Sequence, residues 1–151
     1  MRQLASFTVE IACTCPPREA LRRVLDLRQH SRIIPFTSVS PALTLDELAP
    51  GAEFIARTAV GPVGFDDVMR VDELTQGADF SAARVRISKH GRAIRGTILL
   101  TVMPIRDGSL VTWHQQVRLP WLPGFLQPLA ARVIRAGYQA VLRKLLALDP
   151  A

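Results

Sequence analysis

The chain has little of what several protein classes require. Its only cysteines, Cys13 and Cys15, lie two positions apart at a strand end, where we expect opposed side chains and no disulfide. No apolar run approaches the roughly 18 residues of a membrane span. Met1-Arg2-Gln3-Leu4 leads directly into an alternating strand, so no signal peptide is indicated. These absences predict a soluble, cytoplasmic protein without a disulfide framework.

Cofactor and nucleophile motifs are also missing. The chain has no phosphate-binding loop, dinucleotide fingerprint or nucleophile elbow. The histidines His30, His90 and His114 fall in separate segments without ligand-like spacing, and Cys13-Thr14-Cys15 is too short to hold zinc. We therefore expect no metal and no cofactor.

Acidic residues are outnumbered by basic ones. Nineteen Lys and Arg against thirteen Asp and Glu give a net charge of +6, which permits attraction to nucleic acid, acidic lipid or an acidic ligand. Binding of single-stranded nucleic acid also needs exposed aromatic residues among the basic ones. Here the aromatic residues fall mainly on apolar faces, so we do not expect a nucleic-acid partner.

The first 120 residues read as one strand, two short helical pieces and a series of hairpins. At 151 residues the chain forms a single domain, 1–151, with its own core. The first strand, Ser6 to Cys13, alternates between apolar and polar residues, and Pro16-Pro17 opens a short helix. A second short helical or irregular piece runs through His30. Strand-like runs follow at Thr37–Leu45, Glu53–Val60, Val63–Leu74, Phe80–Lys89, Ala93–Ile105 and Ser109–Leu119.

A long helix from Gly124 to Leu148 closes the chain. Its apolar residues recur at three- and four-residue spacing, which predicts one face packed on a sheet. They are Phe125, Leu126, Leu129, Val133, Tyr138, Val141, Leu142, Leu145 and Leu146. A run of antiparallel strands with helices on one side is an α+β architecture, and a curved sheet around one helix can enclose a cavity.

The hairpin turns predict which residues face the helix. A turn at Gly61-Pro62 puts Asp67 inside, opposite Ala56, and pairs Arg57 with Asp66 outside as an exposed ion pair. Turns at His90-Gly91 and Asp107-Gly108 agree on one apolar inner face. The pairs they predict are Ile87 with Ile94, Val85 with Gly96, Ala83 with Ile98, Val102 with Trp113, Leu100 with Gln115 and Ile98 with Val117.

Five short motifs accompany this order of elements. They are Ile34-Pro35-Phe36-Thr37, Gly64-Phe65-Asp66-Asp67-Val68-Met69, Lys89-His90-Gly91-Arg92, Val111-Thr112-Trp113 and Leu119-Pro120-Trp121-Leu122-Pro123. Over essentially its whole length the chain resembles the SRPBCC (START, Bet v 1-like) superfamily, specifically its polyketide cyclase/dehydrase and lipid-transport branch. The resemblance implies a helix-grip fold: a seven-stranded curved antiparallel sheet around a long C-terminal helix, with two short helices after the first strand. It also implies a cavity for an apolar or aromatic small molecule.

Two polar residues, Asp67 and Gln115, face the predicted cavity. Burial in apolar surroundings raises the pKa of a carboxyl group, which makes Asp67 the candidate catalytic acid or base. The alternative is that Asp67 satisfies backbone or hydroxyl groups. We expect ligand contacts from Phe54, Thr58, Phe65, Asp67, Met69, Ile87, Ile98, Trp113, Gln115, Val117, Phe125, Leu129 and Tyr138.

Three functions fit the sequence. The leading one is binding of a hydrophobic or aromatic, lipid- or polyketide-like molecule by a monomer or homodimer. The second is a cofactor-independent cyclase, aromatase or dehydratase that uses the same pocket, with Asp67 as acid or base. The third is an interaction module acting through the outer sheet face, which carries Arg70, Arg84, Arg86, Arg95 and Arg118, with Arg86 opposite Arg95.

Overall fold

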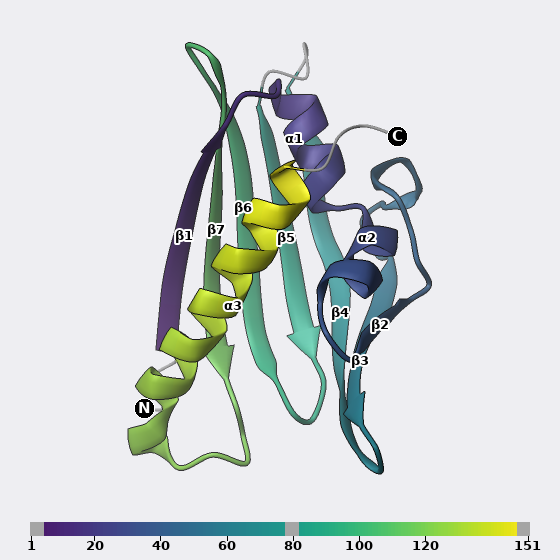
Figure 1. Ribbon diagram of the computed structural model, residues 1–151, viewed down its shortest axis with the longest axis vertical. Helices are drawn as coiled ribbons and strands as arrows, with labels where there is room; N and C mark the ends of the chain where they lie inside the picture. The colour runs from purple at the N-terminus through teal and green to yellow at the C-terminus, as the bar shows by residue number, and fades with distance from the viewer. Residues whose placement is uncertain (1–4, 78–81, 148–151) are drawn as a thin grey trace.

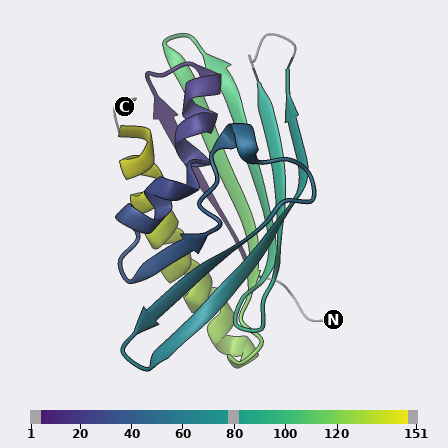
Figure 2. The ribbon, with the colours of Figure 1, turned by 90° about the vertical axis from the view of Figure 1, so that its right-hand side faces the viewer.

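Seven antiparallel strands form one curved sheet, and α1, α2 and α3 lie on one side of it (Figures 1 and 2). The computed structural model describes residues 5–77 and 82–147. The strand order β1-β7-β6-β5-β4-β3-β2 makes β1 and β2 the two edges. The strands are β1 (Ala5–Cys13), β2 (Thr37–Ser40), β3 (Glu53–Val60), β4 (Val63–Gln76), β5 (Ala83–His90), β6 (Arg95–Ile105) and β7 (Gly108–Arg118). The helices are α1 (Pro17–Val24), α2 (Leu27–Ile33) and α3 (Gln127–Ala147), with 3-10 turns η1 (Leu45–Glu47) and η2 (Gly124–Leu126).

This arrangement confirms the α+β helix-grip fold. Inward-facing side chains of neighbouring strands make the core, and Val9, Val85 and Leu100 are completely buried in it. The expected strand start at Phe80 and helix end at Leu148 lie outside the described residues. None of the helices within residues 5–77 and 82–147 has the length and apolar character needed to cross a membrane.

One stripe of α3 packs toward the sheet. Ala131, Ile134, Tyr138, Leu142 and Leu145 recur at three- and four-residue spacing, and each is buried or packs against the core. Arg23 of α1 donates from Nη1 to the Leu146 carbonyl oxygen at 2.6 Å, which fixes the end of α3 against α1. The second half of α3 is therefore held firmly against the rest of the fold.

The expectation that Phe125, Leu129 and Val133 also face the sheet is wrong. Their exposed fractions are 81%, 58% and 66%. Apolar residues occupy two adjacent stripes of α3, and periodicity alone does not say which stripe contacts the sheet. The stripe that carries Leu129 and Val133 faces outward.

The turn at Gly61-Pro62 is confirmed in every predicted pair. Ala56 lies opposite Asp67 on the inner face. Outside, Arg57 Nη1 donates to Asp66 Oδ1 at 2.9 Å, as expected for an exposed cross-strand ion pair.

The β6–β7 hairpin keeps its predicted faces but not its predicted pairs. Trp113 lies opposite Leu100 rather than Val102, and the other expected pairs shift in the same way. The turn consists of Arg106 and Asp107, one position earlier than predicted. This moves the pairing by two residues, and an even shift leaves every side chain on its original face.

The β5–β6 pairing is shifted by four residues. Ile87 lies opposite Ile98 rather than Ile94, because the strands continue through His90 and residues 91–94 form the loop. The same correction removes the expected contact between Arg86 and Arg95. Arg86 instead faces Leu99 on one side and Glu73 on the other.

The expected pair of Arg86 and Arg95 is therefore absent from the outer face of the sheet, but the β6–β7 register sets Arg95 opposite Arg118 instead. Arg70 pairs with Asp72 at 2.9 Å, and Arg84 lies 3.9 Å from Glu73. Acidic side chains on β4 thus neutralise part of this surface.

The expected strand from Thr37 to Leu45 is shorter in the structure. β2 ends at Ser40 because Pro41 has no N–H to donate to a ladder. Thr44 and Glu47 then form a capping box that begins η1.

The expected separation of the two cysteine side chains is also wrong. The Sγ atoms of Cys13 and Cys15 are 3.1 Å apart, and both cysteines are free. Residues two apart in a strand share a face, and the chain leaves β1 at Cys13. Burial and the neighbouring Cys13 raise the pKa of the Cys15 thiol to about 11.

Candidate functional site

An apolar cavity of about 470 Å³ lies between the sheet, α2 and α3. Strands β3, β4 and β5 contribute Phe54, Met69 and Ile87 to its wall. Leu27 begins α2 and Leu142 lies on α3, and both line the cavity from the opposite side. A cavity of this size and lining is typical of small-molecule sites.

A polar cluster interrupts the apolar wall. Asp67 on β4 and Tyr138 on α3 line the cavity, and Lys89 on β5 joins them. Lys89 Nζ donates to Asp67 Oδ2 and, over 3.1 Å, to the Tyr138 hydroxyl. Lys89 lies on the inner face because it is opposite Met69, one diagonal step from Asp67.

This cluster is almost completely withdrawn from solvent. The Lys89 side chain is 1% exposed and that of Asp67 is 10% exposed. Burial alone would lower the pKa of Lys89, but Tyr138 and Asp67 outweigh it and hold that pKa above its ordinary value. The expectation that Asp67 stands alone in apolar surroundings is therefore wrong, since an ammonium group neutralises it.

Two hydrogen-bonding positions of the cluster are left open. Asp67 Oδ1 is buried and has no partner among the described residues. The Tyr138 hydroxyl accepts from Lys89, which leaves its own proton for another acceptor. A bound molecule that both donates and accepts a hydrogen bond would complete the cluster.

Aromatic packing fixes Tyr138 in place. Its ring stacks on Trp113 with centroids 4.9 Å apart and on Phe7 at 6.0 Å. Trp113 in turn donates from Nε1 to Gln115 Oε1 at 3.1 Å. These contacts preorganise the hydroxyl before any ligand arrives.

A family model described as polyketide cyclase/dehydrase and lipid transport matches residues 5–148. The chain belongs to this family. The match confirms the resemblance to the SRPBCC, Bet v 1-like superfamily. No curated protein shows significant sequence similarity to this chain.

Several solved structures share the fold of this chain. Ara h 8.0201 superposes with a TM-score of 0.68 at 11% identity, over 97% of this chain and 100% of that one. TTHA0849 from Thermus thermophilus superposes with a TM-score of 0.67 at 16% identity, over 93% of this chain and 94% of that one. DynU16, a protein of the dynemicin biosynthetic locus, gives 0.57 at 19% identity, over 93% of this chain and 45% of its own. At such identities these structures establish the fold alone.

The structure brings eight of the thirteen expected contact residues to the cavity wall. They are Phe54, Thr58, Phe65, Asp67, Met69, Ile87, Trp113 and Tyr138. Their contact with a ligand stays a prediction.

The other five expected contact residues are not on the cavity wall. Phe125 and Leu129 are exposed on the outer stripe, while Ile98 and Val117 are buried in the core. Gln115 is fully buried beside Trp113, and its Nε2 has no partner among the described residues.

Sequence reasoning missed Lys89, which was placed only within a hairpin motif. The signal was present, because alternation along β5 puts Val85 and Ile87 inside and therefore Lys89 as well. A lysine at a strand end is usually solvated, and the turn predicted at His90-Gly91 placed it at an edge. β5 instead continues through His90, which keeps Lys89 inside the sheet with its side chain in the interior.

His30 also lies on the cavity wall. Its Nε2 is 2.7 Å from the Val24 carbonyl oxygen, which can only accept, so Nε2 carries the proton. Burial lowers the pKa of His30, which favours a neutral ring with Nδ1 as an acceptor. Within residues 5–77 and 82–147, no three His, Cys, Asp or Glu side chains are grouped so that they could hold a metal ion.

Proposed function

We propose that this protein binds a hydrophobic or aromatic small molecule in the cavity between the sheet and α3. The observation that carries this proposal is the buried Oδ1 of Asp67, which has no partner within residues 5–77 and 82–147, on a mostly apolar cavity wall. An unsatisfied buried acceptor costs about 1–3 kcal/mol, and a ligand donor would recover that free energy.

The cluster suggests which ligand chemistry would fit. A hydroxyl or phenol group could donate to Asp67 Oδ1 and accept from the Tyr138 hydroxyl at the same time. The apolar remainder of the ligand would pack on Phe54, Met69 and Trp113. A lipid- or polyketide-like molecule with one such polar group has both features.

Native mass spectrometry of the purified protein tests this proposal. We expect a co-purified apolar molecule, or uptake of the fluorescent probe 1-anilinonaphthalene-8-sulfonate with a dissociation constant of about 10 μM or tighter. A chain that stays ligand-free and takes up neither this probe nor a panel of phenolic lipids would contradict the proposal.

A second candidate is a cyclase or dehydratase reaction in the same cavity. The observation that favours it is the buried Asp67, Lys89 and Tyr138 cluster. Asp67 Oδ1 could take a proton from a carbon between two carbonyl groups. The Tyr138 hydroxyl would then donate a hydrogen bond to the resulting enolate oxygen.

Turnover of a synthetic poly-β-ketone separates the two candidates. If the protein is an enzyme, Asp67→Asn should lower kcat by about a hundredfold or more while probe affinity changes little. Tyr138→Phe, which keeps the aromatic stack, should lower kcat less. Absent turnover in the wild type would leave ligand binding as the function, whereas unchanged turnover in Asp67→Asn would remove Asp67 from the mechanism.

A further inference from the structure

Large apolar side chains are exposed mainly at one end of the molecule. Of the eleven among the described residues, eight lie on the segments around the end of β3 and the start of α3. We call them the apolar rim: Phe36, Val60, Val63, Phe65, Trp121, Phe125, Leu129 and Val133. Phe125, Val63 and Phe36 are 81%, 75% and 70% exposed. Scattered single residues need no explanation, but a concentration of this kind marks an interaction surface.

Two contacts between segments fix parts of the apolar rim in place. The Phe36 carbonyl accepts from Ala59 N at 3.0 Å, which places the α2–β2 loop beside the end of β3. Trp121 Nε1 donates to the Ala93 carbonyl at 3.0 Å, which joins the β7–α3 segment to the β5–β6 loop. Figure 1 shows the β7–α3 segment, the β5–β6 loop and the β3–β4 turn along the lower end of the molecule, with the α2–β2 loop above that end.

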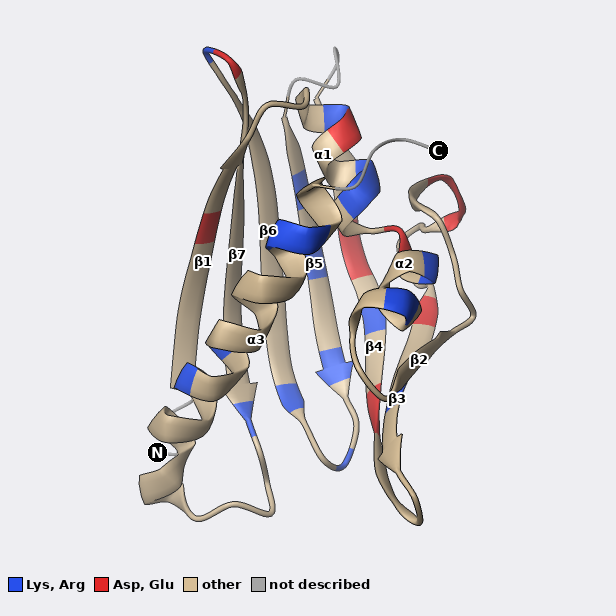
Figure 3. Cartoon of the chain, viewed as in Figure 1, with Lys and Arg blue, Asp and Glu red and all other residues tan. Residues whose placement is uncertain are grey.

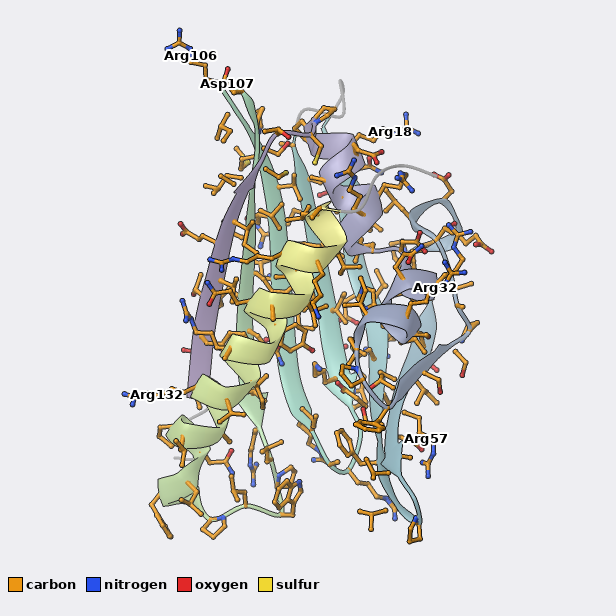
Figure 4. All side chains as sticks on the ribbon, viewed as in Figure 1. Arg18, Arg32, Arg57, Arg106, Asp107 and Arg132 are labelled. Carbon is orange, nitrogen blue, oxygen red and sulfur yellow. The ribbon has the colours of Figure 1, made fainter. Side chains whose placement is uncertain are left out.

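Positive charge accompanies the apolar rim. Segments 32–36, 57–66, 90–95 and 118–133 contain six arginines and one acidic residue, Asp66, whereas the rest of the chain has thirteen basic and twelve acidic residues. This end therefore carries +5 of the net +6. Among the described residues in Figure 3, the acidic colour at the lower end is confined to a short stretch of β4, and Figure 4 shows Arg57 and Arg132 pointing outward there.

The apolar rim is continuous with the cavity. Phe65 belongs to both, and it is 40% exposed. Pro35 precedes Phe36 and is itself exposed on the cavity wall. On α3, Gly137 follows Val133 by one helical turn and also lines the cavity. An apolar molecule could thus pass from the rim to the cavity along apolar surface.

We propose that this end of the molecule docks on an anionic lipid bilayer, with the apolar rim inserted at the boundary between headgroups and acyl chains. Arginines around the rim would contact lipid phosphates, each contributing attraction near a negative surface. A second copy of the chain would present the same positive end, and the two ends would repel each other. An anionic bilayer matches both the apolar and the charged part of the surface.

Vesicle flotation tests the proposal directly. Wild type should bind phosphatidylcholine–phosphatidylglycerol vesicles, and salt or pure phosphatidylcholine should weaken that binding. The triple variant Phe36→Ser, Val63→Ser, Phe125→Ser should lose about tenfold or more in affinity. The matched control Met103→Ser, Ile105→Ser removes two exposed apolar residues near the opposite tip and should bind like wild type.

A second readout follows the inserted tryptophan. Brominated phosphatidylcholine in the mixed vesicles should quench tryptophan fluorescence in wild type, and Trp121→Phe should remove most of that quenching. The proposal is overturned if the wild-type protein does not bind the mixed vesicles, or if the triple variant binds them as well as the control variant does. It is equally overturned if sedimentation shows a homodimer that the triple variant breaks apart, because a second copy would then cover the rim.

Discussion

Replacing Asp67 with Ala is expected to lower the free energy of unfolding by about 3–5 kcal/mol, because it leaves the Lys89 ammonium buried without its carboxylate. The Lys89 side chain is 1% exposed, and its remaining partner is the hydroxyl group of Tyr138, not a carboxylate. Urea unfolding followed by circular dichroism measures the change.

The chain supplies a control for this substitution at the adjacent position. Asp66 forms an ion pair of 2.9 Å with Arg57, but both side chains are about half exposed. Asp66→Ala should therefore cost less than about 1 kcal/mol. Equal losses at the two positions would contradict the burial argument.

A paired replacement should recover most of the lost stability. Lys89→Met together with Asp67→Leu removes both charges and keeps apolar volume, which is often neutral or stabilising for a buried pair. If the double variant does not fold, the cluster is required for the fold itself. If it folds and loses affinity for phenolic lipids, the ion pair serves the ligand.

Enlarging Gly137 should close the cavity without unfolding the protein. No atom lies within 4 Å of a Cβ built at this helical position, and the residue lines the cavity. Gly137→Trp should lower the affinity for an apolar probe by about tenfold or more, because the indole occupies ligand space. Probe titration by fluorescence measures this loss.

Two neighbouring variants make the result specific. Gly137→Ala should raise the free energy of unfolding by about 0.5–1 kcal/mol, since glycine is a poor helix former, and should retain the probe. Ala136→Trp places the same indole one residue away on an exposed position that does not line the cavity. Equal loss of probe in Ala136→Trp and Gly137→Trp would show that helix perturbation, and not blockage, is responsible.

Side-chain faces were more predictable than strand pairings. The two-residue period identified the inner positions Asp67, Ile87 and Trp113 correctly, even where the pairing was displaced by two or four residues. A turn offset moves partners along a strand, but an even offset cannot move them to the other face. The inner face of the sheet could therefore be predicted, although its contacts could not.

Features that depend on three-dimensional packing were not predictable. Which apolar stripe of α3 meets the sheet depends on the rotation of the helix, so Phe125 and Leu129 were assigned to the cavity wrongly. The partnership of Lys89 with Asp67 and Tyr138 joins residues far apart in the sequence, and no local motif marks it. The branch of the family and the helix-grip fold, by contrast, followed from the order of elements and short motifs.

The pairing of β1 with β7 has a consequence for how the protein is made. Ala5 lies opposite Val117, so the sheet is completed only when segments more than a hundred residues apart meet. Such distant pairings fold slowly, because the intervening chain must be ordered first. During translation, β1 has no partner strand until β7 has been synthesised. The cavity is therefore complete only after α3 has been synthesised, and chains arrested before β7 should expose an unpaired strand edge that chaperones would recognise.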